Sequence, residues 1–209
     1  MLKLKSKALI KDAFILFLIT IISGGLLGAV YDLTKEPIAL QQEESQLNAY
    51  REVMKEADDF KEEDNQLIVQ CAKKLKGDYG TNGIEITNAL KAYKDNLNLG
   101  YVIQVIDKDG FGGDIEIIIG IDNQKIITGV EILSIDETVG LGMNAKNEEF
   151  RNQYIGKKVD EFKVVKTGSL SDDEIDALSG ATITSKAMTN GINGALDFYD
   201  LLIDKGGLE

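Results

Sequence analysis

The feature that most constrains the fold of this chain is an uncharged, mostly apolar run, residues 13–31, between Asp12 and Asp32. Nineteen such residues are long enough to cross the hydrocarbon core of a bilayer as a helix. Four lysines and no acidic residue precede the run: Lys3, Lys5, Lys7 and Lys11. The positive-inside rule therefore predicts a cytoplasmic N-terminus, residues 1–12, and places the rest of the chain outside the cytoplasm.

A cleaved signal peptide is the competing explanation of this run. The apolar region of a signal peptide is usually shorter, and no convincing small-x-small cleavage site follows it here. We therefore favour an uncleaved anchor in the cell membrane. Gly24 and Gly28 form a small-xxx-small pair that would let another membrane helix pack closely, although glycine is also simply tolerated in membrane helices.

Composition excludes several classes of catalytic site. The 209 residues include no histidine, which removes Ser-His-Asp and Cys-His nucleophilic sites and the commonest zinc ligand. The single cysteine, Cys71, cannot form an internal disulfide or a multi-cysteine metal site. A carboxylate-only metal site stays possible, but the acidic residues resemble a solvated surface, so we expect no metal and no catalytic side chain. A redox protein of this composition must borrow its redox centre.

The charge balance argues against nucleic acid as a partner. The chain carries 35 acidic and 23 basic residues, a net charge of −12, and the N-terminal lysines belong to the cytoplasmic segment. Affinity for nucleic acid depends on lysine and arginine that neutralise phosphates, so the acidic outer part is poorly suited to it. Solubility alone explains the acidic surface adequately.

The segment after the membrane run is less clear. Pro37 predicts the exit from the membrane helix. Ile38 to about Phe60 has a loosely helical apolar pattern, so we expect a juxtamembrane helix, followed by an acidic segment, residues 61–65. Residues 66–98 are ambiguous, with β-like runs such as Leu67–Val69 and a turn region at Gly77–Gly83.

The middle of the chain predicts three consecutive strands. Tyr101–Ile106 is rich in β-branched residues, and a turn follows at Asp107–Gly110. Asp114–Ile121 and Lys125–Ser134 are the next two strands. Short connections between successive strands favour an antiparallel meander. With helices before and after it in the sequence, the predicted fold class is α+β.

A seven-residue motif, Asp176-Ala177-Leu178-Ser179-Gly180-Ala181-Thr182, leads into a predicted helix from Ile183 to about Ile203. The unpaired N–H groups and the dipole at a helix start favour an anion. Gly180 has no Cβ, so the backbone can approach a ligand closely there. An ordinary Ser/Thr N-cap explains the same residues, and on this motif alone the cap is the favoured interpretation.

Two loops beside the strands are rich in glycine: Gly110-Phe111-Gly112-Gly113 and Glu137-Thr138-Val139-Gly140-Leu141-Gly142. Clustered glycines indicate either a demanding turn or a ligand. Taken alone, the first loop is better explained as a hairpin end with a bulge. The second is not a standard two-residue turn, and its Glu-Thr start suggests polar contacts. Neither loop has the spacing of a Rossmann fingerprint or a P-loop.

In this order, the elements resemble the FMN-binding-domain family that includes the G subunit of the Rnf electron-transport complex. The C subunit of the sodium-translocating NADH:quinone reductase is a relative. The resemblance covers most of the chain: the anchor, the exit at Thr34–Ile38, both glycine loops and the Asp-x-x-Ser-Gly-Ala-Thr motif. Val139 replaces the usual proline of the family loop, and Ile135 stands where many relatives have histidine. The compact length favours the Rnf protein.

The resemblance implies a covalent flavin. In the family, a flavin transferase esterifies the FMN phosphate to the last threonine of the motif, which is Thr182 here. Asp176, Ser179, Gly180 and Ala181 would complete that motif. The flavin site would also be lined by a group of loop residues, Glu137, Thr138, Gly140, Leu141 and Gly142. Thr184 and Ser185 would offer hydroxyl groups near the phosphate.

The resemblance also implies a role. The chain would carry electrons in a membrane complex that couples electron transfer from ferredoxin to NAD with outward movement of sodium or protons. Its partners would be the A, B, C, D and E subunits. The FMN would relay electrons between an iron–sulfur centre in the membrane subunits and the flavin of the D subunit.

The expected division is a cytoplasmic N-terminus (1–12), a membrane helix (13–31), a juxtamembrane helix with the first part of the outer domain (32–92), and an FMN-binding domain (93–209). Two alternatives stay open. One is the C subunit of the quinone reductase. The other is an anchored sensor or scaffold without flavin, in which Thr182 would be an ordinary helix cap.

Overall fold

The structure, a computed structural model, describes residues 2–75, 77, 79 and 82–205. The chain forms two compact units, Met1–Ser45 and Gln46–Glu209. The first unit contains most of α1 (Leu2–Val53), a single helix of 52 residues. The second unit contains the end of α1 and all other elements.

The first part of α1 has the properties of a membrane anchor. Within Leu9–Val53 lies a window with a mean hydropathy of 2.4 and no burial inside the protein, which makes the helix long and apolar enough to cross a membrane. Large apolar side chains are exposed over several consecutive turns, including Phe14, Leu18 and Ile22. Such a surface needs an apolar medium to cover it. The predicted single span is therefore consistent with anchoring in a membrane.

Our prediction for the segment after the span is wrong in two places. The helix does not end near Pro37 but runs through it to Val53, so no separate helix begins at Ile38. A proline inside a helix costs about 3 kcal/mol, but the neighbouring Lys, Glu, Ala, Leu and Gln residues are strong helix formers that extend the helix on both sides. The expected helix also ends early, because Asp59–Glu62 forms strand β1.

A five-stranded sheet is the centre of the second unit. Its strands are paired in chain order, each antiparallel to the next: β1 (Asp59–Glu62), β2 (Ile84–Lys94), β3 (Leu97–Asp107), β4 (Ile115–Asp122) and β5 (Ile127–Ile135). The predicted three-stranded meander is confirmed in β3, β4 and β5, with ends that differ by a few residues. Strands β1 and β2 extend it on the side of β3.

The ambiguous segment before the meander contains a helix as well as strand β2. Leu67–Val69 is not a strand but part of α2 (Asn65–Ala72). The side chain of Asp64 caps this helix by accepting a hydrogen bond from the Gln66 N–H at 2.9 Å. A three-residue apolar run carries no periodicity that distinguishes strand from helix. The predicted turn at Gly77–Gly83 lies partly outside the described residues.

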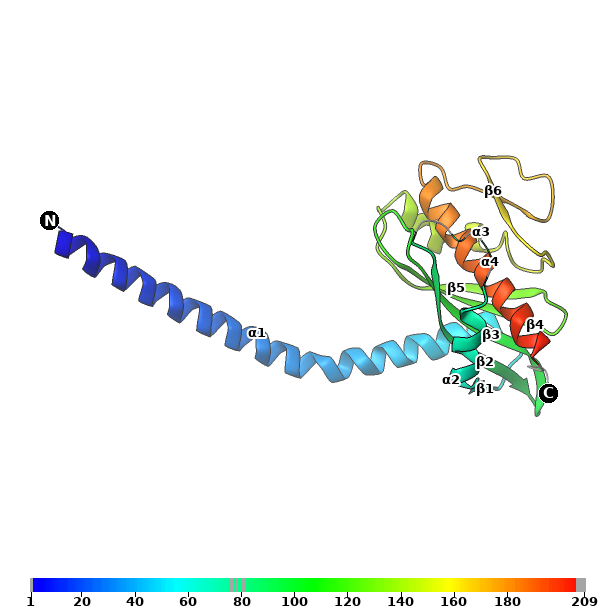
Figure 1. The fold of residues 1–209 in the computed structure, drawn as a ribbon, viewed down its shortest axis with the longest axis horizontal. Coiled ribbons are helices and arrows are strands. Elements are labelled where there is room, and N and C mark those ends of the chain that lie inside the picture. The colour runs from blue at the N-terminus through cyan, green and yellow to red at the C-terminus, as the bar shows by residue number, and fades with distance from the viewer. Residues whose placement is uncertain (1, 76, 78, 80–81, 206–209) are drawn as a thin grey trace. The chain divides into compact units, whose positions relative to one another are not determined.

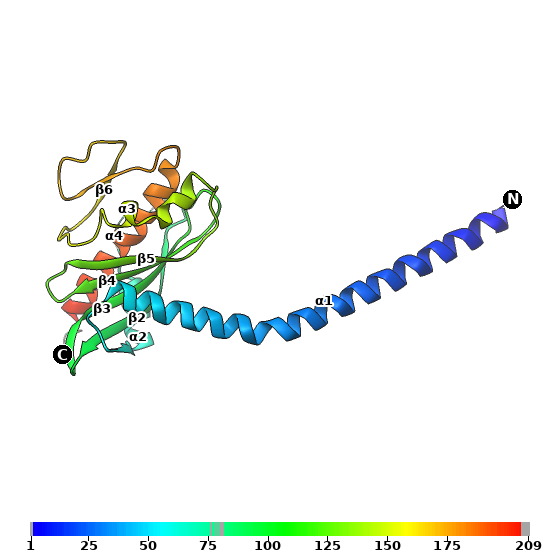
Figure 2. The ribbon, with the colours of Figure 1, turned by 180° about the vertical axis from the view of Figure 1, so that it is seen from behind.

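Helices cover both faces of the sheet, which confirms the α+β class. Helix α4 (Thr182–Asp204) matches the predicted C-terminal helix and packs with α2 against one face, over a core of isoleucine, valine and aromatic side chains. Figure 1 shows α4 crossing this face. The last turns of α1, residues 46–53, cover part of the other face, as Figure 2 shows from behind.

The end of α1 is fixed tightly on the sheet. The Thr128 hydroxyl donates a hydrogen bond to the Val53 carbonyl at 2.6 Å. Two glycines make room for this helix end, because a Cβ at Gly120 or Gly129 would lie 2.4 Å from a Val53 backbone atom. The remaining elements are short: η1 (Gly142–Lys146), α3 (Glu148–Arg151), and the parallel pair β6 (Lys163–Val165) and β7 (Glu174–Asp176).

Asp107, at the end of β3, is a fully buried acid on the face covered by α4. Its Oδ1 accepts the Asp109 N–H at 2.8 Å, while its Oδ2 has no hydrogen-bond partner within the described part of the chain. Burial, helped by the nearby charges of Asp109 and Asp114, raises the pKa of Asp107 to about 7. The protonated form is therefore favoured in the folded protein at mildly acid pH.

We predict that Asp107 makes folding stability fall as the pH rises. Between about pH 4 and 7 the folded state holds a proton that the unfolded state has released, so the contribution is complete below pH 4 and lost by about pH 7. The expected slope is about 1.4 kcal/mol per pH unit. Asp107→Asn should remove this slope. The test is to measure the free energy of unfolding of both proteins in urea across this pH range. The same pH dependence in the two proteins would contradict the prediction.

Candidate functional site

A pocket of about 350 Å³ lies where three segments of the second unit meet. These segments are the loop between β3 and β4, the loop after β5, and the start of α4. The volume is in the range of small-molecule sites. The pocket is lined by Phe111, Glu137, Thr138, Leu141, Gly142, Gly180, Ala181, Thr182, Ile183 and Thr184.

Helix α4 begins at the pocket without a side-chain cap. Ala181 occupies the N-cap position, and Thr182 is the first helical residue. The Thr182 side chain is exposed, and within the described residues its hydroxyl makes no hydrogen bond. The alternative that Thr182 is an ordinary N-cap is therefore contradicted. The first turn of α4 contains no acidic residue, so its N–H groups are available to an anion.

Ser185 lies beneath the motif loop and not in the pocket lining. Its fully buried hydroxyl donates a hydrogen bond to the Ala181 carbonyl and accepts one from the Leu178 N–H, both at 2.9 Å. Thr189 continues this buried chain by donating to the Ser185 carbonyl. The expectation that Ser185 faces a phosphate needs revision, because its hydroxyl already joins the loop to the helix.

Asp176 and Ser179 also lie outside the lining. The carboxylate of Asp176 accepts hydrogen bonds from Ser169, the closer from its N–H at 3.0 Å. The Asp176 N–H donates to Gln153 Oε1 at 2.7 Å, so this residue fixes the chain that leads to the motif. Ser179 is exposed. Gly180 has a φ of +73°, which a residue with a side chain rarely adopts.

The loop after β5 begins with a tight turn. The Leu141 N–H donates to the Thr138 carbonyl at 3.1 Å, and Gly140 has a φ of +78°. These are the features of a type II turn with Val139 and Gly140 at its central positions. Gly140 therefore shapes the turn and does not line the pocket.

Glu137, Gly142 and Thr184 meet closely at the bottom of the pocket. Glu137 and Thr184 are buried, with 8% and 1% exposure. A Cβ at Gly142 would lie 2.6 Å from Glu137 Oε2 and 2.7 Å from Thr184 Oγ1, so the packing requires glycine. The structure thus brings together Glu137, Thr138, Leu141, Gly142, Gly180, Ala181, Thr182 and Thr184 of the predicted residues.

Two lining residues were missing from the sequence prediction. Phe111 and Ile183 are large apolar side chains that are 69% and 52% exposed. Phe111 lies in a glycine loop that we noted but explained as a hairpin end. Ile183 precedes the apolar positions that face the core, so the helical pattern did not select it. The sequence signal that could have identified Ile183 is an apolar residue on the exposed side of a suspected anion site.

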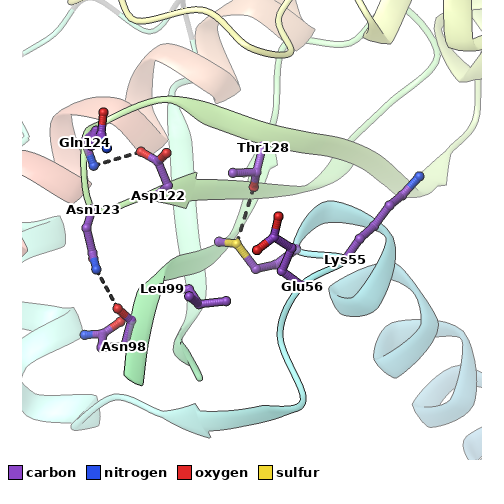
Figure 3. Close-up of a pocket in the computed structure, with 9 residues that line it drawn as sticks. Lys55, Glu56, Asn98, Leu99, Asp122, Asn123, Gln124 and Thr128 are labelled. Carbon is purple, nitrogen blue, oxygen red and sulfur yellow. Dashed lines mark hydrogen bonds between the residues drawn. The ribbon is translucent and has the colours of Figure 1, made fainter. Parts of the chain in front are cut away.

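A larger pocket, about 450 Å³, lies at the opposite ends of strands β3, β4 and β5, beside the end of α1 (Figure 3). None of the predicted site residues lines it. Its wall consists of Met54, Lys55, Glu56, Asn98, Leu99, Asp122, Asn123, Gln124 and Thr128. Many of these polar groups serve the turn itself, as where Asp122 accepts the Gln124 and Ile126 N–H groups at 2.8 Å.

Comparison with known families separates the two pockets. Residues 110–197 match the FMN-binding domain family, and residues 1–53 match the RnfG N-terminal region. The first match contains every residue that lines the smaller pocket, whereas it leaves out five residues of the larger one: Met54, Lys55, Glu56, Asn98 and Leu99. The fold and the site define a membrane-anchored flavoprotein with an FMN-binding domain.

The most informative relatives belong to one kind of complex. The chain is 32% identical over 196 residues to the G subunit of an ion-translocating oxidoreductase complex of Aliivibrio fischeri, covering 90% of this chain and 89% of the relative. It is 34% identical to the G subunit of a proton-translocating ferredoxin:NAD(+) oxidoreductase complex of Clostridium ljungdahlii, covering 84% and 83%. The chain therefore belongs to the family of Rnf complex G subunits, as its motifs predicted.

A solved structure has a similar fold. The NqrC protein of Shewanella oneidensis superimposes with a TM-score of 0.51 and 19% identity, over 58% of this chain and 61% of that one. This similarity concerns the fold of the domain.

The pocket residues fit an FMN group. The free N–H groups at the start of α4 suit a phosphate, and Thr182 presents an unengaged hydroxyl beside them. Phe111, Leu141 and Ile183 supply apolar surface next to this polar end. A phosphate attached to a flat aromatic ring system needs this combination.

The turn at Val139 predicts a stabilising substitution. Proline is favoured at the second position of a type II turn, and Val139 is 86% exposed, so little contact is lost by replacing it. Val139→Pro should increase the free energy of unfolding by about 0.4–1 kcal/mol, because it restricts the unfolded chain. Chemical denaturation measures the effect, with Val139→Ala as the control. An unchanged or lower stability would show that the turn does not accept proline.

Removing the Ser185 hydroxyl should weaken the motif loop. Ser185→Ala leaves the partly buried Leu178 N–H without its acceptor and should lower the free energy of unfolding by about 1–3 kcal/mol. The exposed Ser179 of the same motif is the matched control, since Ser179→Ala should change stability by less than about 0.5 kcal/mol. If the two substitutions changed the free energy of unfolding in urea equally, the role assigned to the Ser185 hydroxyl would be contradicted.

Proposed function

We propose that this chain is the FMN-carrying electron-transfer subunit of a membrane complex that couples ferredoxin:NAD oxidoreduction to ion translocation. Family membership and the FMN-binding domain support the proposal. Two relatives are named as subunits of ferredoxin:NAD(+) oxidoreductase complexes, one proton-translocating and one Na(+)-translocating. Membership in the family is therefore compatible with either ion.

The flavin is attached covalently through a phosphoester to Thr182. The observation that carries this step is the exposed, unengaged hydroxyl at the first position of α4, inside the pocket. The threonine oxygen loses its proton and forms the bond to phosphorus, while the bond from that phosphorus to the leaving group of an activated flavin, such as the nucleotide half of a flavin dinucleotide, breaks. The product has the mass of the protein plus FMN minus one water. A flavin transferase supplies the activated flavin.

The residues of the chain locate the group and shape its surroundings. When bound, FMN supplies the electron-transfer chemistry, and the protein supplies position and environment. The N–H groups at the start of α4 stabilise the negative phosphodiester. Ser185 and Asp176 hold the loop that presents Thr182, although neither lines the pocket.

The other redox centres belong to partner subunits. This chain has one cysteine, which is buried, and no histidine, so it lacks ligands for an iron–sulfur cluster. The chain would hold the FMN between the membrane iron–sulfur subunits and the D subunit, among the A, B, C, D and E subunits, where the flavin would supply electron transfer from one partner to the other. The N-terminus is cytoplasmic, and the FMN-binding domain, residues 93–209, lies on the other side of the membrane.

Two alternatives are less well supported. The fold similarity to NqrC fits the quinone-reductase protein, but the relatives over most of the chain are Rnf complex G subunits. An anchored scaffold without flavin needs Thr182 only as a helix cap, and the cap position is occupied by Ala181.

The decisive experiment is an intact-mass spectrum of the protein purified from its native membrane, with Thr182→Ala beside it. We expect a mass gain of FMN minus one water that the substitution abolishes. Thr167→Ala, at an exposed threonine outside the motif, should keep the gain. Thr182→Ala should also change the free energy of unfolding by less than about 0.5 kcal/mol, because it removes no cap. An unmodified wild-type mass, with the transferase present, would overturn the proposal.

A further inference from the structure

We propose that Glu137 is a positioning residue that fastens the loop Gly110–Gly113 to the wall of the pocket and so holds Phe111 beside the bound flavin. The inference rests on the proposed function for the flavin, but the fastening is a property of the protein alone.

The central contact joins two loops that are far apart in the sequence. The Phe111 N–H donates a hydrogen bond to Glu137 Oε1 at 2.8 Å. Glu137 is 8% exposed, whereas the Phe111 side chain is 69% exposed and lines the pocket. A buried side chain therefore holds the backbone of a residue that lines the pocket. Hydrogen bonds to a charged acceptor are stronger than neutral ones.

The second oxygen of Glu137 is confined as well. Oε2 and Thr184 Oγ1 both lie within 2.7 Å of the position that a Cβ would take at Gly142, so the carboxylate lies beside Gly142 and near the first turn of α4. Because Glu137 is only 8% exposed, its side chain has little free space in which to change rotamer. Glu137 is thus fixed on one side by rigid structure and presents its other oxygen to the loop.

The loop itself has little else to hold it. Three of its four residues are glycines, which leave the backbone with the greatest conformational freedom. Gly112 is pressed against the other loop, since a Cβ there would lie 1.7 Å from the Asp136 carbonyl oxygen. This contact leaves no room for a side chain at residue 112, but it involves no hydrogen bond. The hydrogen bond from Phe111 to Glu137 is consequently what selects one position of the loop.

Amide hydrogen exchange on the full-length protein in detergent tests the fastening directly. Protection of the Phe111 amide should be lost in Glu137→Ala and retained in Glu137→Gln, which keeps an acceptor oxygen of the same reach. Gly112→Ala should also lose protection, because it forces the loops apart without changing Glu137. Retained protection at Phe111 in both Glu137→Ala and Gly112→Ala would overturn the inference.

The flavin gives the functional readout. In the flavin-loaded proteins, Glu137→Ala and Gly112→Ala should change the visible absorption and fluorescence of the flavin in the same direction as Phe111→Ala, with one flavin still attached per protein. Glu137→Gln should keep the wild-type spectrum. Wild-type spectra in Glu137→Ala and Gly112→Ala would overturn the positioning role.

The two proposals fail separately. If the wild-type protein carries no flavin, the proposed function fails, while exchange at the Phe111 amide, measured also in flavin-free Thr182→Ala, still decides whether Glu137 fastens the loop. If flavin is attached but exchange and spectra do not respond to Glu137→Ala and Gly112→Ala, only the positioning role fails.

Discussion

The packing of α4 against the sheet is the contact on which the site depends. Two glycines bring the helix close: a Cβ at Gly191 would lie 2.9 Å from Ile117, and one at Gly194 would lie 1.8 Å from Ile84. Because the helix packs this closely on the sheet, its first turn has a defined position relative to the strand ends. The exposed Thr182 therefore has a defined place next to the loops after β3 and β5.

A chain of buried hydrogen bonds also fixes the position of the motif loop before α4. The Tyr154 hydroxyl and Thr189 Oγ1 are 2.8 Å apart, Thr189 donates to the Ser185 carbonyl, and Ser185 bonds to both ends of the loop before α4. All three side chains are almost completely buried, so an unpaired group among them would be costly. The hydroxyl groups of Ser185 and Thr189 thus support the loop, whereas the exposed Thr182 lines the pocket.

How far the sequence predicts this structure depends on whether a feature is local. Strands β3 to β5 and helix α4 were predictable, because runs of β-branched residues bounded by turns, and helical spacing, are properties of neighbouring residues. We wrongly predicted that the membrane helix ends near Pro37, because a rule based on proline alone takes no account of the helix-forming residues on both sides. The position of Ser185 under the loop, and of Phe111 at the pocket, depend on contacts between distant segments. Composition and spacing contain no record of such contacts, and only the family motif indicated where they would gather.

The shallow form of the site gives the proposed ester a physical purpose. Phe111, Ile183 and Leu141 are all at least 43% exposed, so the pocket encloses a ligand only in part. A group held by so shallow a site gains little from burial and would dissociate readily. The proposed covalent link would replace that missing affinity by keeping the effective concentration of the flavin high. A flavin attached in this way would stay accessible to the electron-transfer partners proposed for it, which deep enclosure would prevent.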